Sequence, residues 1–498
     1  MTGADEGGRR FATIIGAGPG GIATAIALKD AGIEDFVILE QNATAGGTWT
    51  NNRYPGLCCD VPSTLYEFSF ERKPDWSKPY GRQTELRRYI RDVADKYGVT
   101  PHIRYQTPVV GAQWDHIEGA WTITADDGWT TSSTVLIGAV GMFNRLRWPD
   151  IPGLQDFAGT TVHSGNWPTT GVDITDKTVA VVGTAASAVQ MIPELAKEVD
   201  RLYVFQRSPN WIFPKDDPDY SYQQLEEFRA DPSLHEGPRA DFTDFIERFA
   251  TMDQPDLLAE MQADGMKNLA AVKDPELREK MRPTLPVGAQ RPLFSNSYYP
   301  TFNEKHVELV TDPISHVTPR GVATSDGRER PVDVLVLATG YDTTKFLSVL
   351  DITGRDGRSL AEEWAQAAYA YKGITVPGFP NLFMLYGPNT NNGIIIRMLE
   401  AQADYIADKV RLIRDRKLHA IEVRSEETER YNQKLQRDIN AIDVWRTVGS
   451  RYYRAASGQI VTQWPGTMAA FERLLAEPDD NAFVMTEADS VEQSRVDA

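Results

Sequence analysis

Arg10-Phe-Ala-Thr-Ile-Ile-Gly16-Ala-Gly18-Pro-Gly-Gly21 is the stretch that decides the fold class, and a helical pattern follows it from Ile22 to Asp30. An apolar run that ends at closely spaced glycines and continues into a helix is typical of a parallel strand with a nucleotide-binding turn. Gly16 permits the tight turn, Gly18 lets the backbone approach a pyrophosphate, and Gly21 lets the helix pack closely on the strand. The helix would also present its unpaired amides and positive dipole end to the phosphates.

A carboxylate stands where such a turn needs one. The next apolar run, Phe36–Leu39, ends at Glu40, which lies 24 residues after Gly16. Glu40 could accept hydrogen bonds from ribose hydroxyls and would repel a 2′-phosphate, so this unit suits FAD. The alternative is a glycine-rich turn without a ligand, but the strand, the helix and the acidic residue all fall at the expected places.

The same order of elements recurs in the middle of the chain. An apolar run at Thr178–Val182 leads into Gly183-Thr184-Ala185-Ala-Ser187-Ala188 and a helical stretch, and Leu202–Phe205 is the next apolar run. Arg207 follows Gly183 by 24 residues, so the register is preserved while the charge is inverted. We therefore predict an α/β protein with two Rossmann-like dinucleotide-binding domains, one for FAD and one for NADPH.

The second turn departs from the usual glycine pattern. Ala185 replaces the second glycine, and its methyl group would narrow the approach to a pyrophosphate, whereas Ala188 is an accepted variant of the third glycine. Arg207, followed by Ser208, would lie where a 2′-phosphate sits and therefore favours NADPH over NADH. The alternative for Arg207 is a solvated surface arginine at the end of a strand.

Changes in composition set the expected domain boundaries. The first part of the FAD domain spans residues 1–148, and the NADPH domain spans 149–332 with a helical insertion at about 220–282, where the sequence is charged and rich in Ala, Leu and Glu. The apolar strand at Asp333–Gly340 would return the chain to the FAD domain, whose second part spans 333–476. Residues 477–498 are acidic and poor in aromatic residues, which indicates a loose tail.

The bulk composition excludes several classes of function. The chain has 498 residues, of which 41% are hydrophobic and 24% charged, as expected for two or three globular domains. A formal net charge of -18 argues against nucleic acid or an anionic membrane as a partner. No signal peptide or membrane-spanning run is visible, so we expect a cytosolic protein. The only cysteines, Cys58 and Cys59, are adjacent, which disfavours a flavin disulfide reductase.

A linker ahead of the second turn carries an unusual spacing. Phe157, Gly159, His163, Trp167 and Pro168 form the pattern Phe-x-Gly-x-x-x-His-x-x-x-Trp-Pro. This pattern resembles the fingerprint of type I Baeyer–Villiger monooxygenases, which convert ketones to esters or lactones, and the similarity covers most of residues 10–400. We expect His163 to couple the linker to the NADPH domain rather than to catalyse, and Trp167 to be a packing anchor.

Further segments resemble parts of that family. Gly46-Gly47-Thr48-Trp49 and Cys59-Asp60-Val61 look like its flavin-facing segment, and Arg291-Pro292-Leu293 is similar to the segment with its active-site arginine. Gln290 stands where many members have a lysine that helps to bind the 2′-phosphate of NADPH, and together with Ala185 this difference leaves open how strongly the site selects NADPH over NADH. The resemblance implies that FAD is contacted by Gly47, Thr48, Trp49, Asp60, Tyr66 and Val109, and that Arg291 and Asp60 are catalytic.

The implied chemistry needs residues of these types. In this family NADPH reduces FAD, and dioxygen then gives a flavin peroxide that must stay anionic to attack the ketone. The Arg291 guanidinium, which remains protonated, would stabilise that anion and the oxyanion that forms next. The Asp60 carboxylate could orient the guanidinium as a supporting partner. The alternative for these two residues is an ordinary ion pair between domains.

Two other functions stay open from the sequence. A flavin-containing monooxygenase that oxidises nitrogen or sulfur has a similar linker with a different ending, so Trp167, Pro168 and Arg291 favour the ketone reaction. The second alternative, motivated by Ala185 and Gln290, is a flavin-binding protein or oxidase with an altered nicotinamide site. We predict no metal site, and the sequence does not define the ketone or the oligomeric state.

Overall fold

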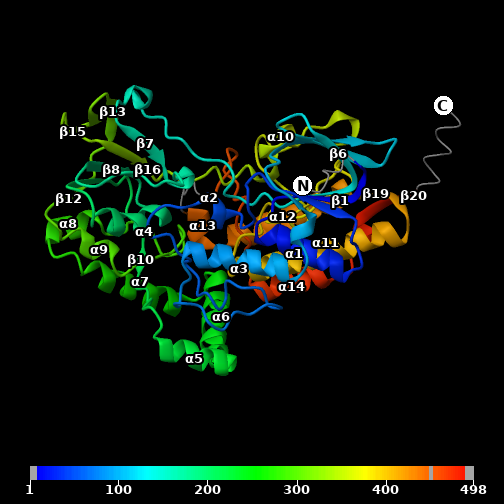
Figure 1. The fold of residues 1–498 in the computed structure, drawn as a ribbon, viewed down its shortest axis with the longest axis horizontal. Coiled ribbons are helices and arrows are strands. Elements are labelled where there is room, and N and C mark those ends of the chain that lie inside the picture. The colour runs from blue at the N-terminus through cyan, green and yellow to red at the C-terminus, as the bar shows by residue number, and fades with distance from the viewer. Residues whose placement is uncertain (1–7, 448–452, 488–498) are drawn as a thin grey trace.

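Two lobes, the first built around a mixed sheet and the second around a parallel one, make up the protein in the computed structural model, which describes residues 8–447 and 453–487 (Figure 1). The first lobe contains β1 (Arg10–Ile15) and α1 (Pro19–Asp30), and the second contains β8 (Thr178–Val182) and α4 (Ala186–Leu195). Each predicted glycine turn therefore joins a strand to a helix in its own lobe. No helix in the described ranges is long and apolar enough to cross a membrane, and the cytosolic location stays a prediction.

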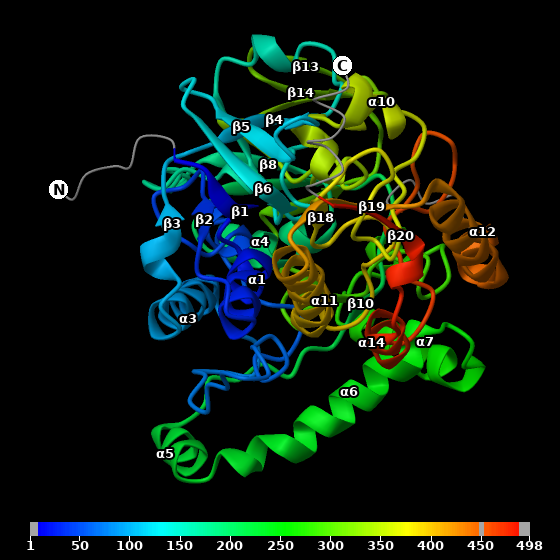
Figure 2. The same ribbon diagram turned by 90° about the vertical axis from the view of Figure 1, so that its right-hand side faces the viewer.

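The sheet of the first lobe has eight strands in the order β17–β4–β5–β6–β1–β2–β3, with β18 paired to β6. β1 lies between β2 and β6 and runs parallel to both. Helices α1, α3 (Gln83–Lys96) and α11 (Ile395–Asp415) lie side by side below this sheet (Figure 2). The other strands are β2 (Phe36–Leu39), β3 (Ile103–Arg104), β4 (Val109–Asp115), β5 (Ala120–Ala125), β6 (Thr130–Gly138), β17 (Asp351–Thr353) and β18 (Leu382–Met384).

The sheet of the second lobe has five parallel strands in the order β12–β9–β8–β16–β7. Its fourth strand, β16 (Val334–Leu337), pairs with β8 on one side and with β7 (Thr160–His163) on the other. The prediction that this strand returns the chain to the FAD domain is therefore wrong, and the second lobe extends beyond residue 332. β9 (Arg201–Phe205) and β12 (Val307–Val310) complete the sheet.

A helical segment fills the predicted insertion at about 220–282. It consists of α5 (Tyr222–Ala230), α6 (Glu236–Ala250), α7 (Pro255–Leu269) and α8 (Pro275–Lys280). Helix α6 runs below the first lobe (Figure 2) and bonds to it, because Arg239 Nη2 lies 2.7 Å from Glu67 Oε1 and Glu247 Oε2 accepts the Met468 amide at 2.8 Å. The segment therefore ties the second lobe to the first.

The predicted loose tail is wrong for its first part. β20 (Phe483–Glu487) pairs antiparallel with β19 (Leu418–Val423). Ahead of it, the buried Asp479 carboxylate lies 2.8 Å from Lys372 Nζ and 2.6 Å from Lys409 Nζ. An acidic residue of the predicted tail is thus paired with two buried lysines. Residues 488–498 lie outside the described residues.

The other helices and strands complete the fold. They are α2 (Thr48–Asn51), β10 (Ile212–Phe213), β11 (Leu293–Phe294), α9 (Tyr298–Thr301), β13 (Ile314–Thr318), β14 (Gly321–Thr324), β15 (Glu329–Pro331), α10 (Leu360–Glu363), α12 (Ser425–Ala441), α13 (Asp443–Thr447) and α14 (Met468–Ala476).

Glu400 in α11 gives the fold a stability that depends on pH. Its half-buried carboxylate accepts the Ser69 backbone amide at 2.7 Å. Burial, helped by the charges of Asp404 and Glu472, raises the pKa of Glu400 from 4.5 to about 7. Because the folded protein holds this proton more tightly than the unfolded chain, the contribution of Glu400 to stability is lost as the pH rises from about 4.5 to about 7.

We predict that Glu400→Gln, which keeps an acceptor for Ser69, raises the thermal unfolding midpoint above that of the wild type at about pH 8. The difference should shrink as the pH falls toward about 5, where the wild-type carboxyl is protonated. Asp92→Asn, at an exposed position in α3, is the control and should show no such trend. A Glu400→Gln difference that is the same at every pH would contradict this prediction.

Candidate functional site

The first glycine turn leaves no room for side chains. Gly16 has φ of 105°, and a Cβ there would lie 2.6 Å from the carbonyl oxygen of Ala139, which follows β6. A Cβ on Gly21 would lie 2.0 Å from the Gly16 oxygen, and one on Gly47 would lie 2.7 Å from Gly18 Cα. No side chain of the described residues caps α1, so its first amides can bind a phosphate.

Glu40 fixes the position of this turn from the end of β2. Its buried Oε2 accepts the Ala17 amide at 2.7 Å, and Oε1 accepts the Asn42 amide at 2.8 Å. A carboxylate oxygen can accept more than one hydrogen bond, so the group can still bind a ribose hydroxyl. Val109 is buried at the start of β4, a strand of the same sheet.

The predicted flavin-facing residues lie directly after the glycines. Thr48 and Trp49 begin α2, and Trp49 Nε1 donates a hydrogen bond to the Tyr66 hydroxyl at 3.0 Å. Burial raises the pKa of Tyr66, so its hydroxyl stays protonated. The structure therefore brings Trp49 and Tyr66 together beside the first turn.

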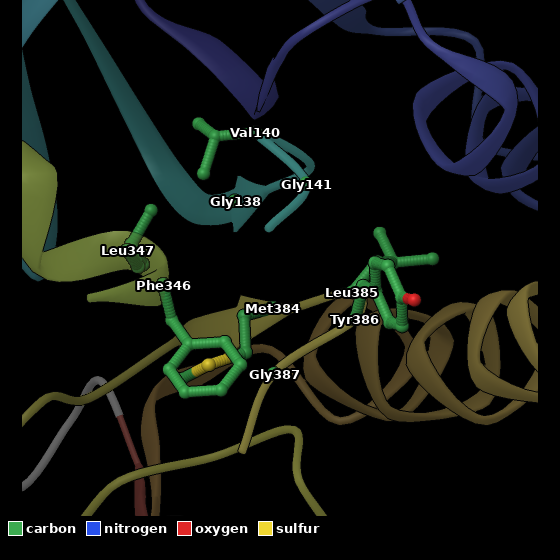
Figure 3. A pocket seen from close by; sticks show the side chains of 9 residues that line it. All are labelled: Gly138, Val140, Gly141, Phe346, Leu347, Met384, Leu385, Tyr386 and Gly387. Carbon is green, nitrogen blue, oxygen red and sulfur yellow. The ribbon is translucent and has the colours of Figure 1, made fainter. Parts of the chain in front are cut away.

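A small cavity opens at the carboxyl ends of β6 and β18 (Figure 3). Ligands of α/β sheets bind at the carboxyl ends of parallel strands. A Cβ on Gly16 would lie 3.7 Å from the amide nitrogen of Val140, so the cavity adjoins the first turn. It is lined by Gly138, Val140, Gly141, Phe346, Leu347, Met384, Leu385, Tyr386 and Gly387.

The second turn repeats the geometry of the first. Gly183 has φ of 112°, and a Cβ there would lie 2.5 Å from the Ala338 carbonyl oxygen after β16. Ala185 is exposed and has φ of -91°, a conformation that alanine adopts without strain. Ala188 is fully buried on the sheet side, while Ser187 is half-buried.

Two exposed residues after β9 lie next to this turn. Thr184 Oγ1 donates a hydrogen bond to the Ser208 carbonyl oxygen at 3.3 Å, and Arg207 precedes Ser208 with its side chain exposed. The glycine turn and the segment of Arg207 and Ser208 therefore meet at one edge of the second sheet.

Asp60 and Arg291 form an ion pair between the lobes. Asp60 Oδ2 lies 3.1 Å from Arg291 Nη2, and their side chains are 13% and 44% exposed. Arg291, preceded by the half-buried Gln290, leads directly into β11, which pairs with β10 of the second lobe. The two residues predicted to be catalytic are thus brought together from segments far apart in the sequence.

The fingerprint residues form and flank the edge strand β7. A Cβ on Gly159 would lie 2.4 Å from the Asp333 oxygen, and the ring of Phe157 packs beside it. The buried His163 accepts the Gly165 amide at Nδ1, and its Nε2 lies 3.2 Å from Thr339 Oγ1. Burial lowers the pKa of His163, which keeps the ring neutral.

The remaining two residues of the fingerprint end the segment. Trp167 lies in the hydrophobic core of the second lobe, and Pro168 is exposed. His163 is therefore placed to hold the linker on the second sheet, while Trp167 anchors it.

Two residues close to the ion pair were missed by the sequence analysis. Gln190 in α4 donates a hydrogen bond to Asp60 Oδ1 at 2.8 Å, and Lys215 Nζ lies 3.0 Å from the Cys59 carbonyl oxygen. Neither belongs to a glycine turn or to the fingerprint, so no sequence pattern marked them. Within residues 8–447 and 453–487 no cluster of His, Cys, Asp or Glu could hold a metal ion.

Comparison with known proteins identifies the family. A family model described as pyridine nucleotide-disulphide oxidoreductase matches residues 13–235, which include both glycine turns. A Baeyer–Villiger monooxygenase of Pseudomonas aeruginosa is 35% identical over 95% of this chain and 91% of its own length. An FAD-binding monooxygenase of Aspergillus niger is 35% identical over 94% of this chain and 80% of its own length.

Solved structures show the same similarity. Cyclohexanone monooxygenase from Rhodococcus bound to NADP+ superposes with a TM-score of 0.87 at 29% identity, covering 97% of this chain and all of that one. Since the sequence similarity spans nearly the full length of both proteins, the chain belongs to the Baeyer–Villiger monooxygenase family of FAD-dependent enzymes.

Proposed function

We propose that this protein uses FAD and NADPH to insert one oxygen atom of dioxygen next to the carbonyl of a ketone, which gives an ester or a lactone. The observation that carries this proposal is the Asp60–Arg291 ion pair, at 3.1 Å, which joins the two dinucleotide-binding lobes. The full-length similarity to Baeyer–Villiger monooxygenases supports the reaction type. When bound, FAD supplies the redox chemistry, since it accepts hydride from NADPH and activates dioxygen.

The first turn is assigned to FAD. Gly16, Gly18, Gly21 and Gly47 let the backbone of this turn pack closely, because a Cβ at these places would meet neighbouring backbone, and such a tight turn suits a pyrophosphate. The buried Glu40 carboxylate suits ribose hydroxyls and disfavours a 2′-phosphate. Thr48, Trp49, Asp60, Tyr66 and Val109 are assigned to the rest of the cofactor.

The second turn is assigned to NADPH. Its residues Gly183, Thr184, Ala185, Ser187 and Ala188 follow the same strand-to-helix geometry as the first turn. The exposed Arg207 guanidinium, next to Ser208, would pair with the 2′-phosphate, since guanidinium binds phosphate with two hydrogen bonds. Gln290 can contribute a neutral hydrogen bond there.

Arg291 is assigned the role of the catalytic cation. Its guanidinium stays protonated and can stabilise the negative charge that develops on the ketone oxygen. Asp60 accepts from this guanidinium on one side, so it fixes the direction of the charge. The half-exposed Arg291 side chain can be reached by a substrate, whereas Asp60 is largely buried.

Phe157, Gly159, His163, Trp167 and Pro168 are assigned to coupling of the lobes. The His163–Thr339 contact holds the linker at the carboxyl end of β16, where the second sheet meets the first lobe. Loss of this contact would disturb the arrangement of the lobes rather than remove a reacting group.

Product analysis tests the reaction type. Purified protein with FAD, NADPH and dioxygen is expected to convert ketones, cyclic ones included, to products heavier by one oxygen atom, identified as esters or lactones by mass. A matched sulfide is the competing substrate. Formation of a sulfoxide without any ester would overturn the proposal in favour of N- or S-oxygenation.

Replacement of Arg291 by Ala should separate the two half-reactions. We expect anaerobic bleaching of the flavin by NADPH to continue, while ester formation falls about 100-fold or more, because the stabilising cation is lost. Arg291→Lys keeps a charge without the fork geometry and should recover only part of the activity. Ester formation at the wild-type rate by Arg291→Ala would remove Arg291 from the mechanism.

Arg207→Ala tests the assignment of the second turn. The KM for NADPH is expected to rise about tenfold through loss of a hydrogen-bonded ion pair with the 2′-phosphate, while the KM for NADH changes little. Arg320→Ala, at an exposed arginine of the same lobe, is the control. An equal rise for both nucleotides would show that Arg207 does not read the 2′-phosphate.

A further inference from the structure

The segment from Tyr54 to Asp60 crosses from the first lobe to rest on α4 of the second lobe. Gly56 has φ of 78°, and a Cβ there would lie 2.4 Å from the Gln190 carbonyl oxygen. A side chain at this position would therefore push the segment off the helix. The backbone of the first lobe thus lies directly on the helix that starts at the second glycine turn.

The side-chain amide of Gln190 holds this segment with both of its ends. Its Nε2 donates to the Cys58 carbonyl oxygen at 3.0 Å and to Asp60 Oδ1 at 2.8 Å. Its Oε1 accepts from the Tyr54 hydroxyl at 3.0 Å and lies 3.5 Å from the Cys58 amide nitrogen. Because the carbonyl and the carboxylate can only accept, the amide has one possible orientation.

Lys215 holds the same segment from a second direction. Its Nζ, on a side chain that is 6% exposed, lies 3.0 Å from both the Cys59 carbonyl oxygen and the Cys58 Sγ. The ammonium also lies 4.4 Å from the centre of the Tyr80 ring. A buried ammonium requires such partners, so its placement restricts where residues 58 and 59 can lie.

We infer that Gln190, supported by Lys215, is a positioning residue that sets the Asp60 carboxylate for its contact with Arg291. Asp60 then has one oxygen bonded to Gln190 and the other to Arg291. Gln190 lies in the second turn of α4, whose first turn follows Gly183–Ala185. The helix that begins at the predicted nicotinamide site therefore also orients the carboxylate of the ion pair.

This inference rests on the proposed function, because it assigns Asp60 and Arg291 to oxygen insertion. It adds that the arrangement of this pair depends on the second lobe through an uncharged side chain. The consequence is that Gln190 governs how efficiently NADPH oxidation is coupled to ester formation, without binding the nucleotide itself.

Gln190→Leu in the FAD-loaded protein tests the inference. We expect the ester formed per NADPH consumed to fall about 10-fold or more, as for loss of a hydrogen bond to a charged group. Three quantities should stay within about twofold of the wild type: the KM for NADPH, the dissociation constant of NADP+ measured by calorimetry, and the FAD content. The inference gives Gln190 no contact with either nucleotide, so the substitution removes none.

Gln190→Glu separates positioning from packing. Glutamate has nearly the same size and keeps an acceptor for Tyr54, but it places a second carboxylate against Asp60, and like charges at this distance repel. A positioning role predicts that Gln190→Glu is impaired at least as strongly as Gln190→Leu. A packing role predicts the reverse, which would overturn the inference. Glu194→Gln, one turn further along α4, is the matched control and should behave as the wild type.

Lys215→Met keeps the test decisive if the Gln190 variants do not fold or do not retain FAD. It removes the bonds to Cys58 and Cys59 but not those to Asp60, and we expect a smaller loss of coupling with unchanged NADP+ affinity. Unchanged coupling in this variant would then overturn the inference.

The failure of this inference differs from failure of the proposed function. If Arg291→Ala abolishes ester formation while Gln190→Leu couples normally, only the role of Gln190 is lost. If Arg291→Ala still forms ester at the wild-type rate, the proposed role of the ion pair is lost first. A weakened affinity for NADP+ in Gln190→Leu would also overturn the inference, since it would make Gln190 a nucleotide-binding residue.

Discussion

The contact between a glycine and a neighbouring carbonyl oxygen is the constraint on which both lobes depend. In each lobe the first glycine of the turn has a positive φ and faces the carbonyl of an alanine that follows the adjacent parallel strand, Ala139 for Gly16 and Ala338 for Gly183. No other residue fits there without displacing backbone. This contact closes the strand-to-helix turn, and it thereby directs the first amides of α1 and α4 to one edge of each sheet.

The local pattern predicted these turns because all of their determinants are close together in sequence. Apolar runs, glycine spacing and the residue 24 positions later correctly placed β1, β2, β8 and β9. The sheet that β16 joins could not be predicted in this way. A run such as Val334–Leu337 is buried on both faces in either sheet, so its composition does not say which pair of strands it joins. The end of the chain was misjudged for a related reason, because the acidic Asp479 is paired with lysines 107 and 70 residues away in sequence.

The residues of the candidate site also differ in whether the sequence alone could predict them. Glu40 and Arg207 follow from their distance to a turn, and Asp60 and Arg291 follow from the family resemblance, since the ion pair joins residues 231 positions apart. Gln190 could not be inferred from either source. Its role depends on the register between α4 and the segment that ends at Asp60, and a glutamine on a helix has the same sequence pattern whether it faces solvent or a carboxylate.

The two members of the ion pair are not held equally. Asp60 is 13% exposed and bonded on its second oxygen by Gln190, whereas the Arg291 side chain is 44% exposed and stands just ahead of the two-residue strand β11. The carboxylate is therefore the less exposed partner, and the guanidinium is the one that solvent and substrate can reach. Such an arrangement suits a cation that must meet a developing negative charge. The carboxylate limits the directions in which the guanidinium can point, and it leaves part of the guanidinium exposed to a substrate. It also explains why Asp60, rather than Arg291, needs support from the second lobe: a carboxylate with only one oxygen paired would leave the other oxygen buried without a donor.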